Sequence, residues 1–222
     1  MHAQAGHDVT GANRNRLHWL LLAIGVAVLA WSGYRPHDYF TWILEVFPAI
    51  IAGVVLVALY PRFRFTDLVY VLILVHAIIL MIGGHYTYAE MPLFSWLRDT
   101  FGLARNHYDR VGHLAQGFVP AMIVREILVR NGVVNGRRWL FVLVCSVALA
   151  ISACYEFFEW WVAVGSGTAA DAFLATQGDV WDTQWDMLLA LCGAVAAQLL
   201  LAGWHDRQLA ALRAPPPSSR QR

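Results

Sequence analysis

One stretch of the sequence places chemically useful polar side chains at the start of an apolar run. It reads Asn106-His-Tyr-Asp-Arg-Val-Gly-His-Leu-Ala-Gln-Gly117. If a helix begins near Asp109, then Asp109, His113 and Gln116 share one face, because residues three and four apart are neighbours on a helix. An imidazole beside a carboxylate forms a general acid/base pair that works near neutral pH. We therefore take this stretch as the centre of a predicted functional site.

Acidic residues recur in two later segments. Glu156 and Glu159 stand near the end of one apolar run, and Asp179, Asp182 and Asp186 lead into the next. The predicted catalytic residues are His113, Asp109, Glu156 and Asp186. The predicted substrate-binding residues around them are Arg110, His85, His107, Gln116, Glu159, Asp179 and Asp182.

The same side chains also suit a metal ion. Imidazole and carboxylate ligands fit zinc, iron or manganese. The candidate metal ligands are His113, Glu156, Asp182 and Asp186. Without a metal, His113 beside a carboxylate would act as a general acid or base, and Arg110 could hold a lipid phosphate with two hydrogen bonds. Both alternatives stay open at this point.

The composition identifies the class of protein. Of the 222 residues, 59% are apolar and 14% charged, against roughly 45–50% and about 25% in soluble globular domains. The basic residues are all arginine, are spread along the chain and stand beside fifteen acids, which argues against a nucleic-acid partner. The three cysteines lie in apolar runs without C-x-x-C spacing, so neither disulfides nor a thiolate metal site is expected. We predict an all-α, polytopic membrane helix bundle.

Apolar runs long enough to span a membrane number about six. They cover residues 17–31, 42–60, 67–83, 111–129, 139–161 and 185–204. No small-x-small cleavage site follows the first run, so an uncleaved helix is favoured. This gives a cytoplasmic segment over 1–16, a single transmembrane domain over 17–204 and a cytoplasmic, disordered tail over 205–222.

The connection over residues 84–108 is long for a loop between two spans. Phe94, Leu97 and Phe101 share a face at helical spacing, which indicates either a short interfacial helix or a loop with aromatic anchors.

The arginines indicate the orientation, because short cytoplasmic loops carry an excess of basic residues. With a cytoplasmic N-terminus, only Arg35, Arg98, Arg105 and Arg110 of the sixteen basic residues fall outside. Both termini are therefore predicted to be cytoplasmic, in a bacterial inner membrane. All the predicted site residues then lie on the outer side.

Charged side chains within a membrane span must meet partners. On insertion scales each costs about 2.5–3.5 kcal/mol at the centre of a helix, and less near the interface. We expect the acids of the last three spans to face one another, either as a functional site or as a structural cluster neutralised by Arg110 and His113. His76, alone in mid-span, is predicted to be a hydrogen-bonded core residue. Arg125 and Glu126, near the inner end of their span, are explained by snorkelling.

Four motifs in order resemble one family. They are Gly84-His-Tyr-Thr-Tyr, Asn106-His-Tyr-Asp-Arg-Val-Gly-His, Tyr155-Glu-Phe-Phe-Glu-Trp and Gly178-Asp-Val-Trp-Asp-Thr-Gln-Trp-Asp-Met. Together they resemble the YjdF-type family of small bacterial inner-membrane proteins over about residues 17–204. The resemblance implies a helical fold and an inner-membrane location, and it implies no reaction.

A second resemblance, over the last half of the chain, is to VanZ-like membrane proteins. Their pattern is Asp-Lys-x-x-His opening one helix and Asp-x-x-x-Asn followed by Gly in a later one. Here Asp109-Arg-Val-Gly-His113 has Arg in place of Lys, and Asp186 stands in place of Asn four residues after Asp182, with Gly193 downstream. This resemblance implies work on the cell envelope and a link to glycopeptide tolerance.

Three classes of function remain open. The first is a membrane-embedded enzyme that acts on a lipid or lipid-linked cell-envelope substrate at the outer face. The second is a small-solute or proton-coupled permease, which would need polar groups through the full depth of the membrane. The third is a structural or assembly protein without catalysis. Membrane lipids are expected partners in each case.

Overall fold

The computed structural model describes the backbone of residues 2–167 and 171–213. Every regular element in this part of the chain is helical. The elements are α1 (His2–Ser32), α2 (Tyr39–Leu59), α3 (Asp67–Tyr86), the 3-10 turn η1 (Tyr88–Glu90), α4 (Pro92–Phe101), α5 (Tyr108–Arg130), α6 (Arg137–Ser166), α7 (Asp171–Leu174) and α8 (Asp182–Arg213). The predicted all-α fold is confirmed.

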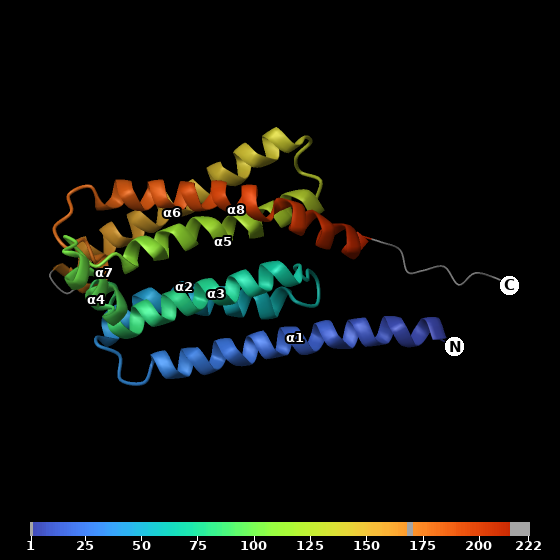
Figure 1. Ribbon diagram of the computed structural model, residues 1–222, viewed down its shortest axis with the longest axis horizontal. Coiled ribbons are helices and arrows are strands. Elements are labelled where there is room, and N and C mark those ends of the chain that lie inside the picture. The colour runs from blue at the N-terminus through green and yellow to red at the C-terminus, as the bar shows by residue number, and fades with distance from the viewer. Residues whose placement is uncertain (1, 168–170, 214–222) are drawn as a thin grey trace.

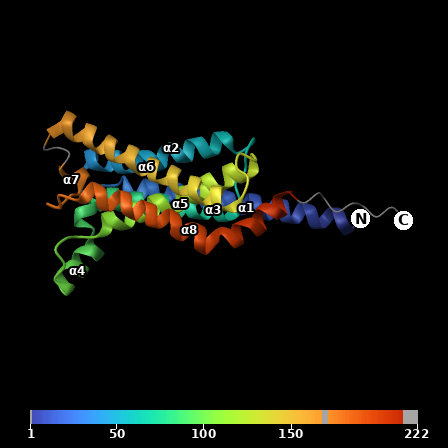
Figure 2. The same cartoon turned by 90° about the horizontal axis from the view of Figure 1, so that it is seen from above.

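The long helices run side by side in two groups. Figure 1 shows α1, α2 and α3 in one group and α5, α6 and α8 in the other, and contacts between α3 and α5 join them. The short elements α4 and α7 lie at one end, and both chain termini lie at the other (Figures 1 and 2). We call the end that carries α4 and α7 the distal end, and the end near the termini the proximal end.

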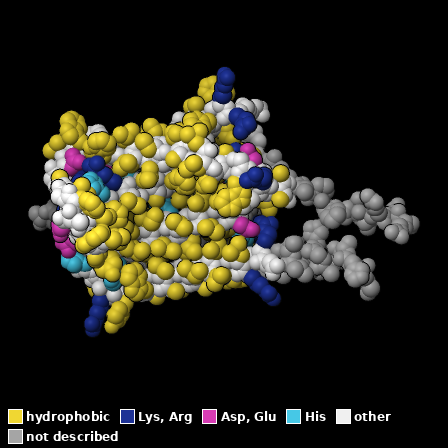
Figure 3. Space-filling model, in the orientation of Figure 1, with side chains coloured by type: hydrophobic (Ala, Val, Ile, Leu, Met, Phe, Trp, Pro, Cys, Tyr) yellow, Lys and Arg dark blue, Asp and Glu magenta, His cyan; other side chains and the backbone are white. Residues whose placement is uncertain are grey.

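Five helices, α1, α2, α3, α6 and α8, are long and apolar enough to cross a membrane by length and composition. The sixth long helix of the described chain, α5, is more polar. It lies against α3, α6 and α8, so protein rather than lipid surrounds its charged side chains. The prediction of about six spans agrees with this arrangement. The surface fits it as well, because apolar side chains cover the middle of the bundle and charged side chains gather near its two ends (Figure 3).

Local sequence signals fix where the helices begin and end. The carboxylate of Asp38 accepts a hydrogen bond of 2.6 Å from the backbone N–H of Thr41 and so caps α2, and this bond lowers the pKa of Asp38. Pro92 opens α4, and Gly102 closes it in a left-handed conformation that favours glycine. Of the two alternatives for the connection over 84–108, a short helix or a loop with aromatic anchors, the structure has the helix, α4.

The closest packing in the bundle is between α5 and α8. Gly117 of α5 faces the backbone carbonyl of Ala190, and Gly193 of α8 faces that of Leu114, so a Cβ at either glycine would overlap the opposite backbone. Small residues at such a crossing let two membrane helices approach closely. One turn towards the distal end, the same crossing brings α8 opposite the site residues of α5.

Helix α8 continues past Trp204 to Arg213. Residues 205–213 are therefore helical and are not part of the disordered tail predicted to begin at 205. Residues 214–222 lie outside the described part. The helix extends because His205 is fully buried against α5, and this contact is not visible in the local sequence.

Candidate functional site

Ionisable side chains from α2, α5, α6 and α8 meet near the distal end of the bundle. All of them except Glu159 are buried. Glu45 joins the group from α2, close enough to interact electrostatically with the side chains of α5. We call this group the distal cluster, and its members are Glu45, Asp109, His113, Glu156, Glu159 and Asp186.

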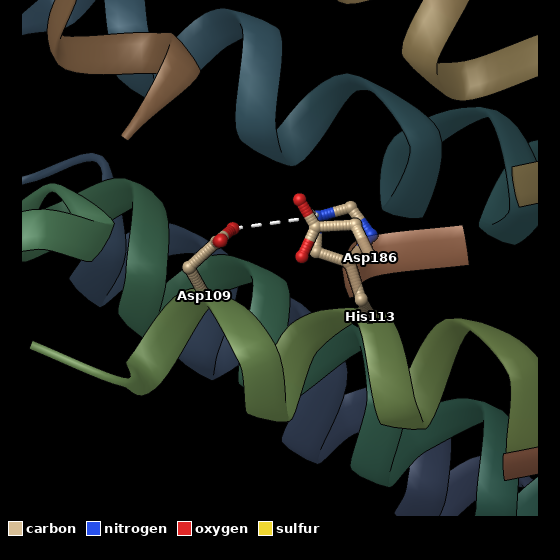
Figure 4. A group of neighbouring side chains, drawn as sticks. All are labelled: Asp109, His113 and Asp186. Carbon is tan, nitrogen blue, oxygen red and sulfur yellow. Dashed lines mark ion pairs between the residues drawn. The ribbon is translucent and has the colours of Figure 1, made fainter. Parts of the chain in front are cut away.

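His113 lies at the centre of the distal cluster. Its Nε2 is 3.3 Å from Oδ1 of Asp109 and 3.9 Å from Oδ2 of Asp186. Its Nδ1 is 3.1 Å from Oε1 of Gln116 and 3.8 Å from Oε1 of Glu156. Figure 4 shows Asp109 and His113 on successive turns of α5, with the Asp186 carboxylate beside the imidazole. The predicted common face on α5 and the predicted meeting of the last three spans are both present, whereas the chemical roles of these residues stay predictions.

A layer of ion pairs covers the cluster on its distal side. The guanidinium of Arg105 is buried, pairs with Asp182 and lies 3.4 Å from Oδ2 of Asp109. Arg110 pairs with Asp179 at 2.7 Å. Burial works against the charge of Arg105, but the hydrogen bond and charge of Asp182 raise its pKa above the usual value, so it stays a cation. The two arginines are thus engaged chiefly by Asp179 and Asp182.

Two buried carboxylate oxygens of the distal cluster have no hydrogen-bond partner among the described residues. They are Oε1 of Glu156 and Oδ1 of Asp186. Leaving a buried acceptor unpaired costs about 1–3 kcal/mol, and more when it is charged. Such atoms are rare in folded proteins and need an explanation, such as a proton, a cation or a ligand.

The structure brings most of the predicted site residues together, with two exceptions. His85 binds the backbone carbonyl of Ser32 at 3.0 Å and lies against the ring of Trp31, so it joins α3 to α1 away from the cluster. His107 precedes α5, where partial burial and the charges of Arg110 and Arg105 lower its pKa and favour the neutral imidazole. Asp182 belongs to the layer of ion pairs formed by Arg105 and Arg110.

Sequence reasoning missed two residues of this region. Glu45 is an acid inside an apolar run. The cost of a charged side chain in a membrane span identified the other acids, and the same argument applies to Glu45. Arg105 stands four residues before Asp109, the spacing of an ion pair on a helix. By sequence alone Arg105 indicates only the topology.

A second buried polar group, which we call the proximal cluster, lies at the other end of the bundle. Its members are Thr66, Arg125, Glu126, Arg130 and His205. Glu126 is fully buried and accepts hydrogen bonds from the backbone N–H of Thr66 at 3.0 and 3.1 Å, its hydroxyl at 2.8 Å, Arg130 at 2.9 Å and His205 at 3.0 Å. Arg125 donates to the other ring nitrogen of His205 at 2.8 Å. The snorkelling predicted for Arg125 and Glu126 is wrong, because both are buried and joined to α8.

The hydrogen bonding predicted for His76 is not found at Nε2. Its Nε2 is buried and lacks a hydrogen-bond partner among the described residues. It lies in α3, near enough to His113 for an electrostatic interaction between the two imidazoles.

Comparison with known proteins identifies the family. Residues 17–207, which include every member of both clusters, match the family model described as "Predicted membrane protein (DUF2238)". The chain is 52% identical over 182 residues to "Inner membrane protein YjdF" of Escherichia coli (strain K12), which covers 82% of this chain and 87% of that protein. No solved structure matches. These findings confirm the resemblance to the YjdF-type family and the inner-membrane location. The chain belongs to the DUF2238 family, and it is a multi-pass integral protein of the inner membrane.

Proposed function

We propose that this protein is an inner-membrane enzyme that performs acid–base chemistry on a lipid or lipid-linked substrate of the cell envelope, in the distal cluster at the outer face. One observation carries the proposal. The distal cluster brings an imidazole and carboxylates from four helices together and still leaves buried oxygens of Glu156 and Asp186 without a hydrogen-bond partner in the described part of the chain. Buried polar groups that serve only the fold are normally satisfied.

The proximal cluster offers the comparison within the same chain. Both oxygens of Glu126 receive hydrogen bonds, from Thr66, Arg130 and His205. A group of this kind stabilises the packing of α5 against α8 and the α2–α3 turn. The distal cluster differs in having acceptors that lack donors among the described residues, and this difference favours a chemical role for it.

The residues would divide the work as follows. Glu156 exchanges a proton with the substrate through its buried Oε1, which lies 3.8 Å from Nδ1 of His113. Arg110 is half-buried, and its guanidinium lies 5.0 Å from the centre of the Trp185 ring. From there it would receive an anionic headgroup, because a guanidinium binds phosphate through two parallel hydrogen bonds. Glu159 and Arg110, the less buried groups, mark the side from which a substrate would enter.

The outer location rests on the arginines. Five arginines lie in or directly beside the turns that join α2 to α3 and α5 to α6: Arg62, Arg64, Arg130, Arg137 and Arg138. Short cytoplasmic loops hold such an excess of basic residues. The distal cluster, at the opposite end of α5, then faces the outside.

Analysis of envelope lipids tests this function. A strain that lacks the gene is supplied with wild-type protein, His113→Gln or Asp99→Asn, and the lipids are compared by mass spectrometry. Asp99 is an exposed acid of α4, outside the cluster, and its variant is the matched control. We expect one lipid species to accumulate in the empty strain and with His113→Gln, and not with the wild type or the control. Identical lipid profiles in all four strains, with all proteins present in the membrane, would overturn the proposal.

A proton-coupled permease is the second candidate, favoured by the presence of buried ionisable groups at both ends of the α5–α8 pair. His76 and Gln198 are polar groups at intermediate positions. Proton uptake by proteoliposomes under an imposed potential distinguishes the two candidates. Uptake that His113→Gln abolishes, together with an unchanged lipid profile, would favour the permease over the enzyme.

A further inference from the structure

We propose that Asp109, His113 and Asp186 bind one divalent transition-metal ion, with zinc or manganese as the cation. The site coincides with the proposed active site, and it rests on the proposed function only for its part in catalysis. Imidazole nitrogen and carboxylate oxygen are common ligands of zinc and manganese. Three protein ligands leave further positions for water or substrate, as in catalytic metal sites.

The distances fit such an ion. One ligand atom from each of the three residues lies within 4.8 Å of the other two. Ligands at about 2.0–2.2 Å in a tetrahedron are about 3.3–3.6 Å apart. Oδ1 of Asp109 already stands 3.3 Å from Nε2 of His113, and Oδ2 of Asp186 stands 3.9 Å from it. Oδ2 of Asp186 therefore lies about 0.3 Å beyond this range from Nε2, and a movement of that size would complete the His113–Asp186 pair.

An independent observation is the unpaired oxygen of Asp186. This side chain is 2% exposed, and its Oδ1 has no hydrogen-bond partner among the described residues. The carboxylate lies beside His113 (Figure 4). A cation between these side chains would supply the missing interaction for a carboxylate that water cannot reach.

The hydrogen-bond partner of His113 Nδ1 determines which ring nitrogen of His113 can bind the metal ion. Oε1 of Gln116 lies 3.1 Å from Nδ1 and accepts a hydrogen bond from its N–H, so that in the neutral imidazole the Nε2 lone pair is directed at Asp109 and Asp186. Histidines that bind metals commonly donate the other ring N–H in this way. Glu156 lies 3.8 Å from Nδ1, on the side where the proton stands, so the second possible ligand group, which is His113 with Glu156 and Glu159, does not form the primary site. Gln116 is accordingly a positioning residue, and Arg105 holds the second oxygen of Asp109 at 3.4 Å.

The charges in the region support the same conclusion. Glu45, Asp109, Glu156 and Asp186 bring acidic side chains to one buried volume. The nearby guanidinium groups are engaged chiefly by Asp179 and Asp182. A divalent cation at Nε2 would relieve the repulsion between these acids, because bound metal ions are often the largest local charges in a site.

Metal analysis of the purified protein tests the site. The protein is purified in detergent, stripped with chelator, loaded with zinc, passed through a desalting column and analysed for metal. We expect about one zinc per chain for the wild type and for Asp99→Asn, and loss of that zinc in Asp186→Asn and His113→Gln. Cobalt serves as a spectroscopic probe, because its visible absorption reports nitrogen and oxygen ligation. Wild-type protein that retains no zinc, or Asp186→Asn that retains as much as the wild type, would overturn the proposal.

Gln116 gives a second test that does not remove a ligand. Gln116→Leu removes the acceptor for Nδ1–H and should weaken zinc binding about 10–100-fold, whereas Gln116→Glu restores an acceptor and should restore the affinity. Equal affinities in all three proteins would contradict the assignment of Nε2 as the ligand.

The enzyme proposal and the metal-site proposal can fail independently of each other. A zinc site with unchanged envelope lipids refutes the enzyme alone, and a lipid change with His113→Gln in a protein that never binds metal refutes the metal site alone.

Discussion

Two substitutions with the same chemistry should have unequal effects on stability. Glu126→Gln and Asp186→Asn each replace a buried acid by its amide, at opposite ends of the α5–α8 pair. The two side chains are 0% and 2% exposed. Burial alone therefore predicts similar losses in the free energy of unfolding for the two variants, whereas the hydrogen bonds predict different losses.

The magnitudes follow from the partners. Glu126 accepts from Thr66, Arg130 and His205, and an amide –NH₂ would direct its protons at one or more of these donors. Breaking a buried, charged network on one side costs about 3–5 kcal/mol. Asp186 loses little, because its Oδ1 has no partner among the described residues and its Oδ2 is 3.9 Å from His113. In metal-free protein we expect Asp186→Asn to change the free energy of unfolding by less than about 1 kcal/mol, or to raise it, because a buried charge is removed.

Reversible unfolding in detergent, followed by tryptophan fluorescence in the presence of chelator, measures both changes. Asp99→Asn is the control, because its carboxylate pairs with Arg98 at 2.8 Å and both side chains face solvent, where an ion pair adds little to stability. If Asp186→Asn destabilises the metal-free protein as much as Glu126→Gln does, the distal cluster is structural and our reasoning about unpaired acceptors fails.

Three further predictions concern packing, charge and topology. Gly117→Ala should lower the free energy of unfolding by about 1–3 kcal/mol, because its Cβ would overlap the backbone of α8, whereas Gly53→Ala, which faces open space, should not; the same unfolding assay compares them. Arg105→Gln should cost about 3–5 kcal/mol, since it leaves buried acids without their cation, and an unfolding curve identical to that of the wild type would contradict the ion-pair layer. In a variant without its native cysteines, an impermeant thiol reagent should label Asp99→Cys in intact spheroplasts and Val133→Cys only after permeabilisation. The reverse pattern would place the distal cluster on the cytoplasmic side.

The sequence predicted the elements better than the contacts between them. Apolar runs identified the long helices, because a membrane span needs about 20 apolar residues and such long runs are typical of transmembrane helices. The spacing of Asp109, His113 and Gln116 predicted a shared helix face, because neighbours at three and four residues follow from helix geometry alone. The meeting of α5, α6 and α8 followed from the cost of unpaired charge in lipid.

The missed residues depend on tertiary contacts. Glu45 comes from α2, and neither spacing nor a local motif links it to α5. Arg125 and Glu126 look like residues that reach the membrane surface, because their partner His205 lies beyond the apolar part of the last run. Only the crossing of α5 and α8, through small residues on each helix, brings these side chains together.

The most direct test of the central claim, that the distal cluster is a metal-binding chemical site, is anomalous X-ray diffraction from crystals of zinc-loaded protein. The account predicts an anomalous peak about 2.0–2.2 Å from Nε2 of His113 and from one carboxylate oxygen each of Asp109 and Asp186. A map in which zinc-loaded crystals show no peak at these three side chains would contradict it.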